Sequence, residues 1–281
     1  MRSQATVGCD TRPYQPLGCA PMRWHLPLGL ALVLAVAAPA TGQVQVPDTN
    51  PCHFYKTALC PDLIMAPPDG LFVGRSAAGR MRLYATNHII NVGKGPLEIK
   101  GKRTGAREME ASQVIHRAGN PPIVVPDAGE LYFKFVDSGR GSYWKYSHAA
   151  RFELWTLKAD GSKGKLVRTG PKLDYCFRDL DRVRAYARRT AFFPGCSQVR
   201  GLASDRLGVS PGWADVYPST YPENWIDITG LKGCFSFVHR ADPLGKIAEI
   251  REDNNYGWRH VRLPPRGGSV APRGCPGPDS S

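Results

Sequence analysis

The stretch Leu83-Tyr-Ala-Thr-Asn-His-Ile-Ile-Asn91-Val-Gly-Lys-Gly-Pro96-Leu-Glu98 places two strand-like runs on either side of a turn. The first run, residues 82–92, is rich in β-branched and aromatic side chains, and the second covers residues 95–100. Between them the sequence predicts a hairpin turn, in which Gly93 and Gly95 supply positive-φ positions and the proline restarts an edge strand.

Similar runs recur along the chain, at residues 130–136, 149–157, 225–228, 234–239 and 256–263. Within one of them, apolar Phe152 and Leu154 alternate with charged Arg151 and Glu153, as a half-buried antiparallel strand requires. No helical period is sustained, and the arginine-rich residues 181–189 are predicted to be a surface loop. The sequence therefore predicts an all-β fold, an antiparallel β-sandwich with long loops in one domain.

The N-terminal region is predicted to be an export signal. Met22-Arg-Trp-His is followed by an apolar run at residues 26–38 and by small residues up to Gly42, and the run is shorter than the ~20 residues that span a membrane. We assign residues 1–42 to a leader and signal peptide, 43–265 to the folded domain, and 266–281 to a tail rich in Pro, Gly and Ser, disordered except where Cys275 ties it down. Residues 1–21 are either an over-long gene start or an extended leader.

Cysteine count and charge fit a secreted or periplasmic protein without a transmembrane helix. Six cysteines remain after the leader, an even number that indicates disulfides, and spacing favours pairing Cys52 with Cys60 and Cys176 with Cys196 among 15 connectivities. The formal charge of +13 becomes about +11 without the leader's three arginines and one aspartate. This charge favours an acidic extracellular polymer or protein as partner, whereas export argues against nucleic acid. No hydrolase elbow Gly-x-Ser-x-Gly is present.

Two motifs carry a resemblance. They are Gly170-Pro-Lys172-Leu-Asp-Tyr-Cys176, and Ser210-Pro-Gly-Trp-Ala-Asp215-Val-Tyr217 followed by Trp225-Ile-Asp-Ile-Thr229. Together with the opening stretch, they resemble the lysyl oxidases, specifically the bacterial single-domain branch, over residues 61–263. That family comprises secreted copper amine oxidases in which a lysine and a tyrosine fuse into lysine tyrosylquinone. The resemblance implies that Lys172 and Tyr217 are the quinone precursors and that Asp215 is the base that abstracts the substrate's α-proton.

The copper ligands of the family, a His-x-His-x-His motif, are missing. Alternate residues of a strand share one face, so the motif presents three imidazoles to one Cu(II) ion. Counting back from Ala150, the corresponding positions are Gly141, Tyr143 and Lys145. Glycine has no ligand atom and a protonated lysine repels the metal, so the sequence predicts loss of copper and of the amine oxidase activity.

The resemblance also implies a structural calcium, held between Pro-Asp-Leu near the N-terminus of the domain and an acidic Asn-Asn segment near its end. The corresponding ligands are Asp62, Leu63, Glu249, Asn254 and Asn255. Arg251 stands where the family often has another acid, for which Glu252 or Asp253 could compensate. The alternative is a polar turn capped by the asparagines.

Two functions follow from these residues. The first is an exported amine oxidase that acts on lysine side chains or small primary amines. The second is a non-catalytic extracellular binding module that presents the arginine-rich residues 178–206 to an acidic polymer or protein. If the chain folds like the lysyl oxidases, we expect Lys172 and Tyr217 to lie close together. We also expect Tyr143 and Lys145 to point toward them.

Overall fold

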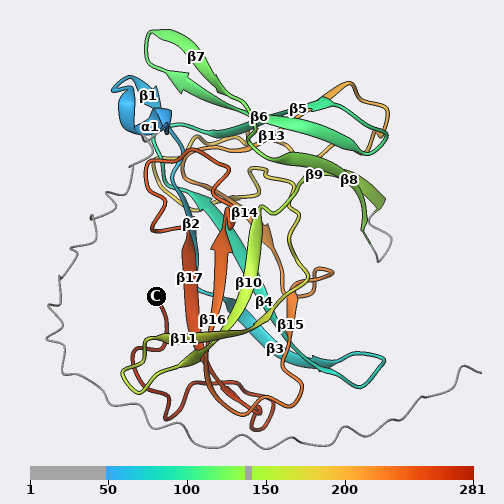
Figure 1. Ribbon diagram of the computed structural model, residues 1–281, viewed down its shortest axis with the longest axis vertical. Helices are drawn as coiled ribbons and strands as arrows, with labels where there is room; N and C mark the ends of the chain where they lie inside the picture. The colour runs from blue at the N-terminus through green and yellow to red at the C-terminus, as the bar shows by residue number, and fades with distance from the viewer. Residues whose placement is uncertain (1–48, 137–140) are drawn as a thin grey trace, which may run out of the picture. The chain divides into compact units, whose positions relative to one another are not determined.

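The computed structural model describes residues 49–136 and 141–281, so the predicted leader lies outside the described residues. The fold is all-β, as predicted, with antiparallel pairing throughout the three sheets (Figure 1). The described part contains one helix, α1 (Pro51–Phe54), which Asn50 caps by accepting a hydrogen bond from the Cys52 amide. Over the described ranges, no helix is long and apolar enough to cross a membrane.

The largest sheet has seven strands and includes several that sequence patterns did not predict. Its order is β13-β5-β6-β8-β9, and β1 and β7 also pair with β6. These strands are β1 (Ala58–Leu59), β5 (Leu97–Arg103), β6 (Glu108–Arg117), β7 (Asn120–Val125), β8 (Glu130–Val136), β9 (Gly141–Tyr146) and β13 (Ser204–Val209).

A four-stranded sheet of order β11-β10-β16-β17 contains three predicted strands, β10, β16 and β17, and one that was not predicted, β11. Its strands are β10 (Ala150–Leu157), β11 (Lys163–Thr169), β16 (Gly233–Ala241) and β17 (Tyr256–Leu263). Figure 1 shows β10, β16 and β17 side by side.

The third sheet is organised around one long strand. Its members are β2 (Leu63–Met65), β3 (Asp69–Arg75), β4 (Met81–Asn91), β12 (Asp181–Arg182), β14 (Trp213–Tyr217) and β15 (Trp225–Asp227). One half of β4 pairs with β2 and β14, and the other half pairs with β3 and β15. β4 therefore supplies side chains to two hydrophobic cores, Ile89 to one and Leu83 and Ala85 to the other.

The segment between β4 and β5 is not the predicted hairpin. β4 and β5 belong to different sheets, so residues 92–96 cross from one sheet to the other. Gly93 and Gly95 are not at positive φ. They are required for close approach instead, because a Cβ on Gly95 would lie 1.8 Å from the Leu59 carbonyl oxygen and one on Gly93 would lie 2.4 Å from that of Cys60.

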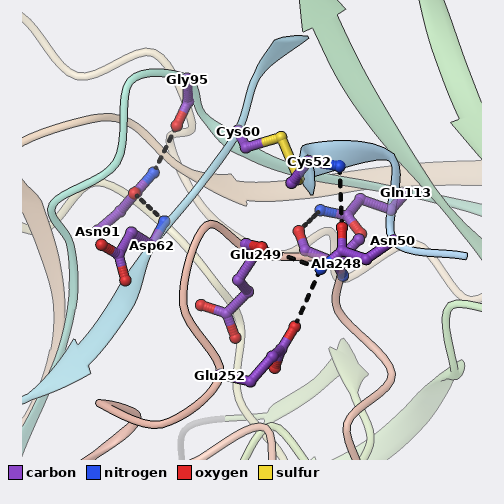
Figure 2. The surroundings of a disulfide bond; sticks show 10 residues. All are labelled: Asn50, Cys52, Cys60, Asp62, Asn91, Gly95, Gln113, Ala248, Glu249 and Glu252. Atoms are coloured by element: carbon purple, nitrogen blue, oxygen red, sulfur yellow. Dashed lines mark hydrogen bonds between the residues drawn. A yellow bond between two sulfur atoms is a disulfide. The ribbon is translucent and has the colours of Figure 1, made fainter. Parts of the chain in front are cut away.

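The Asn91 side chain holds this crossing. Its amide nitrogen donates to the carbonyls of Gly95 (2.9 Å) and Val209 (2.8 Å), and its oxygen accepts from the amides of Gly93 (2.9 Å) and Asp62 (3.2 Å). Figure 2 shows the bonds to Gly95 and Asp62. One fully buried side chain thus connects the end of β4, the crossing, the entry to β2 and the end of β13.

Three disulfides pair all six cysteines of the described part, Cys52 with Cys60, Cys176 with Cys196, and Cys234 with Cys275. Both predicted pairs are confirmed.

The prediction of a disordered C-terminal tail is wrong. In addition to the Cys275 disulfide, main-chain hydrogen bonds join the tail to β17. The His260 amide donates to the main-chain oxygen of Asp279, and the Arg262 amide donates to that of Val270. The tail therefore covers β17, an edge strand whose main-chain groups would otherwise need solvent. The predicted loop at residues 181–189 is also partly strand, since Asp181 and Arg182 pair with β14.

We expect Asn91→Ala to lower the free energy of unfolding by about 3–5 kcal/mol, because it leaves several buried main-chain groups without partners. Asn91→Asp should be similarly damaging, since a carboxylate cannot donate to Gly95 and Val209. Urea unfolding measures both. Asn120→Ala, on the exposed strand β7 where Asn120 donates one bond to Ala118, should change stability little. Equal effects at positions 91 and 120 would contradict this role.

Candidate functional site: a buried lysine and tyrosine cluster

Tyr217 and Lys172 are brought together by the end of β14 and a long connection. Tyr217 ends β14 and lies opposite Asn87 of β4. Lys172 lies in the connection between β11 and β12, which reciprocal main-chain bonds between Tyr146 and Tyr175 hold against β9. Two segments far apart in sequence therefore meet beside the middle of β4.

The Lys172 amine is fully buried among aromatic rings. Its Nζ lies 4.3 Å from the ring centre of Tyr175, 4.4 Å from that of Tyr217 and 4.7 Å from that of Tyr221. It donates one hydrogen bond, of 2.6 Å, to the main-chain oxygen of Asp174. The expectation that Lys172 and Tyr217 lie close together is met, while their role as quinone precursors stays a prediction.

Burial controls the protonation of both groups. The pKa of Lys172 is well below its ordinary value, chiefly because burial disfavours the ammonium form and secondarily because Lys145 is near. The pKa of Tyr217 is well above its ordinary value for the same first reason, with the Asp215 charge adding to it. The Tyr217 hydroxyl oxygen accepts a 2.8 Å bond from the Cys176 amide, so the ring is fixed from the chain that carries Lys172.

Asp215 lies on the same strand as Tyr217, and neither of its carboxylate oxygens has a hydrogen-bond partner among the described residues. Burial raises its pKa to about 7, with Arg178, Lys172 and Lys145 opposing the rise. A carboxyl group that titrates near neutrality beside two lysines can exchange a proton with them. The role of Asp215 as the base stays a prediction.

The three positions that correspond to the missing copper motif, counted back from Ala150, lie on one strand, β9. Lys145 points toward the cluster, because its Nζ donates to the Tyr221 hydroxyl at 3.0 Å and lies 5.9 Å from the Tyr217 ring centre. Tyr143 lines a small cavity of about 170 Å³ together with Tyr217. Gly141 has φ of +88° and no side chain.

These residues do not fit Cu(II). Where three imidazoles would converge, the chain offers a buried amine with a pKa of about 8, a phenol and a glycine. Of the described histidines, His148 bonds Ser147, His116 bonds Glu98 and His239 stacks on Phe152. Among residues 49–136 and 141–281, the one group of three candidate ligand side chains is acidic and contains no histidine.

That acidic group includes one of the predicted calcium residues, Glu249. Glu249 is buried, accepts a 2.5 Å bond from the Leu63 amide, and accepts 2.7 Å from the Asn255 side chain. Asn254 donates to Asp62 at 2.8 Å. All five predicted residues therefore lie together, between the start of β2 and the connection from β16 to β17, and Figure 2 shows Asp62 and Glu249 in this region.

The structure adds two acids to this cluster. Carboxylate oxygens of Asp242, Glu249 and Glu252 lie within 4.8 Å of one another. Glu252, which the sequence offered as compensation for Arg251, joins this group, whereas Asp253 pairs with Arg251 at the exposed surface (3.0 Å). Sequence reasoning missed Asp242, which lies before the motif and whose carboxylate accepts main-chain bonds from residues 246 and 247.

The side-chain oxygens of Asn254 and Asn255 are buried and accept no hydrogen bond within the described chain. Buried amide oxygens without donors, next to carboxylates, are the hard ligands that calcium takes. The residues present therefore fit a calcium ion.

The arginine-rich segment is held rigidly by a carboxylate that sequence reasoning also missed. Buried Asp179 accepts four hydrogen bonds, from the amide and hydroxyl of Ser210 (both 2.7 Å) and from the amides of Phe192 (2.8 Å) and Phe193 (3.3 Å). Asp179 thereby joins both ends of residues 179–193 to the entry of β14. The only sequence signal was an acid in a basic stretch.

Four arginines of this segment, Arg182, Arg184, Arg188 and Arg189, are exposed, and none pairs with a carboxylate of the described residues. Next to them lies a cavity of about 420 Å³ with a basic and aromatic lining that includes Lys94, His116, Arg188, Tyr186 and Phe192. Tyr186 is 62% exposed and Phe192 43%. This surface combines positive charge with exposed aromatic rings.

No protein-family model and no curated protein matches this chain.

The raised pKa of Asp215 predicts a pH dependence. Because the folded-state value of about 7 exceeds the ordinary 3.8, this group stabilises the fold most below pH 3.8, and the stabilisation is lost as pH rises through 7. Between pH 4 and pH 8, the free energy of unfolding of the wild-type protein should fall, relative to that of Asp215→Asn, by on the order of 4 kcal/mol at most. Urea unfolding of both proteins at each pH measures the difference; parallel profiles would refute the assignment.

Proposed function

We propose that this chain is an exported, lysyl oxidase-like protein that binds an acidic extracellular polymer and lacks copper-dependent amine oxidation. The observation that carries the proposal is the set of four exposed arginines without carboxylate partners among the described residues, beside a cavity lined by Lys94 and His116. Guanidinium groups match carboxylate, sulfate and phosphate groups with paired hydrogen bonds.

Rigidity supports a binding role. The Asp179 bonds fix the segment, and Arg182 itself donates to the main-chain oxygens of Ala185 and Ala187. The indole of Trp213 donates to the main-chain oxygen of Arg188 (3.2 Å). A surface that is already ordered loses less conformational entropy when a ligand binds.

Local charge is not cancelled at this surface. Glu98 contacts His116 (2.8 Å), Lys100 (3.8 Å) and Arg206 (3.9 Å), and the exposed Asp181 precedes Arg182 in the segment itself. One carboxylate shared by three basic side chains leaves net positive charge, and the four arginines add to it. An anionic polymer can contact several of these groups at once.

We expect the mature protein to be retained on a sulfated or carboxylated column and released by about 1 M salt, where the screening length is near 3 Å. Changing Arg182, Arg184, Arg188 and Arg189 to Gln should lower the salt concentration needed for elution. The control changes Lys158, Lys165, Arg168 and Lys232 to Gln, which removes equal charge from other exposed sites. Equal shifts in both variants would mean that net charge alone causes retention.

We expect no quinone in redox staining and no hydrogen peroxide from primary amines after the mature protein is incubated with Cu(II). The reason is the donor set at Gly141, Tyr143 and Lys145, which offers no imidazole. Stain and peroxide that both disappear in Tyr217→Phe would restore the amine oxidase as the function. Lys172→Ala would then be expected to remove the stain as well.

We also propose that calcium binds at Glu249 and Asn255, where the carboxylates of Asp242 and Glu252 converge, with Asp62, Leu63 and Asn254 beside it. Support comes from the converging carboxylates and the partnerless amide oxygens. The ion would join the start of β2 to the connection before β17, which fits a structural role.

At a calcium concentration 100 times the dissociation constant, binding should stabilise the fold by about 2.7 kcal/mol, or raise the melting temperature by roughly 5–10 °C. Glu249→Gln should abolish this response, and Asp181→Asn, which removes an exposed acid elsewhere, should retain it. Thermal unfolding with calcium and with a chelator measures both. A response that survives in Glu249→Gln would place the ion elsewhere.

A further inference from the structure

A second cavity has the opposite charge to the arginine surface. It measures about 580 Å³ and lies where β6, β8 and β9 meet the segment that follows β16. Its acidic lining residues are Glu108, Glu110, Asp127, Glu130 and Asp242. Lys246 is the one lysine or arginine of the lining, and His148 is the one histidine. On a chain of formal charge +13, this lining is strongly acidic.

Two of these acids face each other across neighbouring strands. Glu110 of β6 and Glu130 of β8 are paired directly in the antiparallel register, and both are exposed. Neither forms an ion pair or a side-chain hydrogen bond with any residue that the structure describes. Like charges at directly opposed positions destabilise a sheet. A cation bound between them would remove the repulsion.

A buried tyrosine whose hydroxyl lies at the cavity wall provides a second, independent indication of a ligand. Tyr146 at the end of β9 is 1% exposed, and its hydroxyl forms no hydrogen bond within the described residues. The ring packs against Phe177, with centres 5.1 Å apart. The hydroxyl end reaches Gly129, where an added Cβ would lie 2.6 Å from the oxygen, and both residues line the cavity. Tyr146 is buried while its hydroxyl opens onto the cavity, so a ligand there can supply a hydrogen-bond partner that no described residue supplies.

The arrangement favours an organic cation over a metal ion. Of the five acids, only Asp242 belongs to a group of three converging carboxylates in the described chain, and the other members of that group lie outside the cavity lining. The remaining four acids come from β6, β8 and the connection before β8, and the wall also contains apolar Met109 and Leu244. Carboxylates from several elements in a wall that also offers apolar surface match the ammonium groups and the methylene chain of a flexible amine.

We propose that this cavity binds a linear di- or polyamine, with ammonium groups paired to Glu110 and Glu130 and a further amine hydrogen-bonded to the Tyr146 hydroxyl. The volume lies within the range of small-molecule sites, about 300–1,000 Å³. The cavity shares no lining residue with the small cavity beside Tyr217, so this binding is independent of the lysine and tyrosine cluster.

Isothermal titration of the mature protein with putrescine, spermidine and spermine tests the proposal, with calcium present throughout so that the cluster around Glu249 is saturated. Affinity should rise with the number of ammonium groups. The double variant Glu110→Gln and Glu130→Gln should weaken spermine binding about tenfold or more. Lys246→Gln should strengthen it, because a competing cation is removed. The control pair Asp181→Asn and Asp279→Asn, which removes exposed acids elsewhere, should leave it unchanged.

A readout without ligand separates binding from damage to the fold. The Glu110→Gln and Glu130→Gln variant should melt at a higher temperature than wild type when no amine is present, since the opposed charges are gone, and should lose the spermine-dependent rise. Tyr146→Phe should weaken binding without changing its salt dependence. The proposal is overturned if spermine does not bind, if the double variant and the control pair bind alike, or if a lysine-rich peptide binds where the free polyamines do not.

Discussion

The four hydrogen bonds of the Asn91 side chain are the constraint on which the arrangement of sheets depends. They join the end of β4 to β13, to the entry of β2 and to the crossing toward β5. The main-chain oxygen of Asn91 also accepts from the Gly212 amide, at the turn before β14. Because β2 leads from the acidic cluster and β14 leads to Tyr217, this one residue fixes the relative positions of both predicted sites. Buried amide networks of this kind specify an arrangement as well as stabilise it.

Sequence patterns predicted the fold where a strand's own residues determine its structure. β8 and β17 were predicted with their observed bounds, because apolar alternation reports which face of a strand is buried. The crossing at residues 92–96 was mistaken for a hairpin, since its composition is that of a turn while its destination depends on Leu59 and Cys60, more than thirty residues earlier. β6 was missed because its buried face includes Gln113, which bonds the main chain of Ala248.

The candidate sites divide in the same way. Lys172, Tyr217 and the Glu249 region came from motifs that are contiguous in the chain, and the structure brings the members of each together. Asp179 and Asp242 were missed because an isolated aspartate has no pattern, and its importance comes from donors elsewhere in the chain. The opposition of Glu110 and Glu130 depends on strand register across two strands, which no local stretch encodes.

The position of β4 in both cores has a consequence for cooperativity. Its Ile89 packs in one core and its Leu83 and Ala85 in the other, with buried Asn87 between them bonded to Tyr175. Loss of either core would remove the packing partners of half of β4 and expose the polar groups at its middle. A partly unfolded state in which one core is lost and β4 stays intact is therefore not stable. The two cores should consequently melt in a single transition.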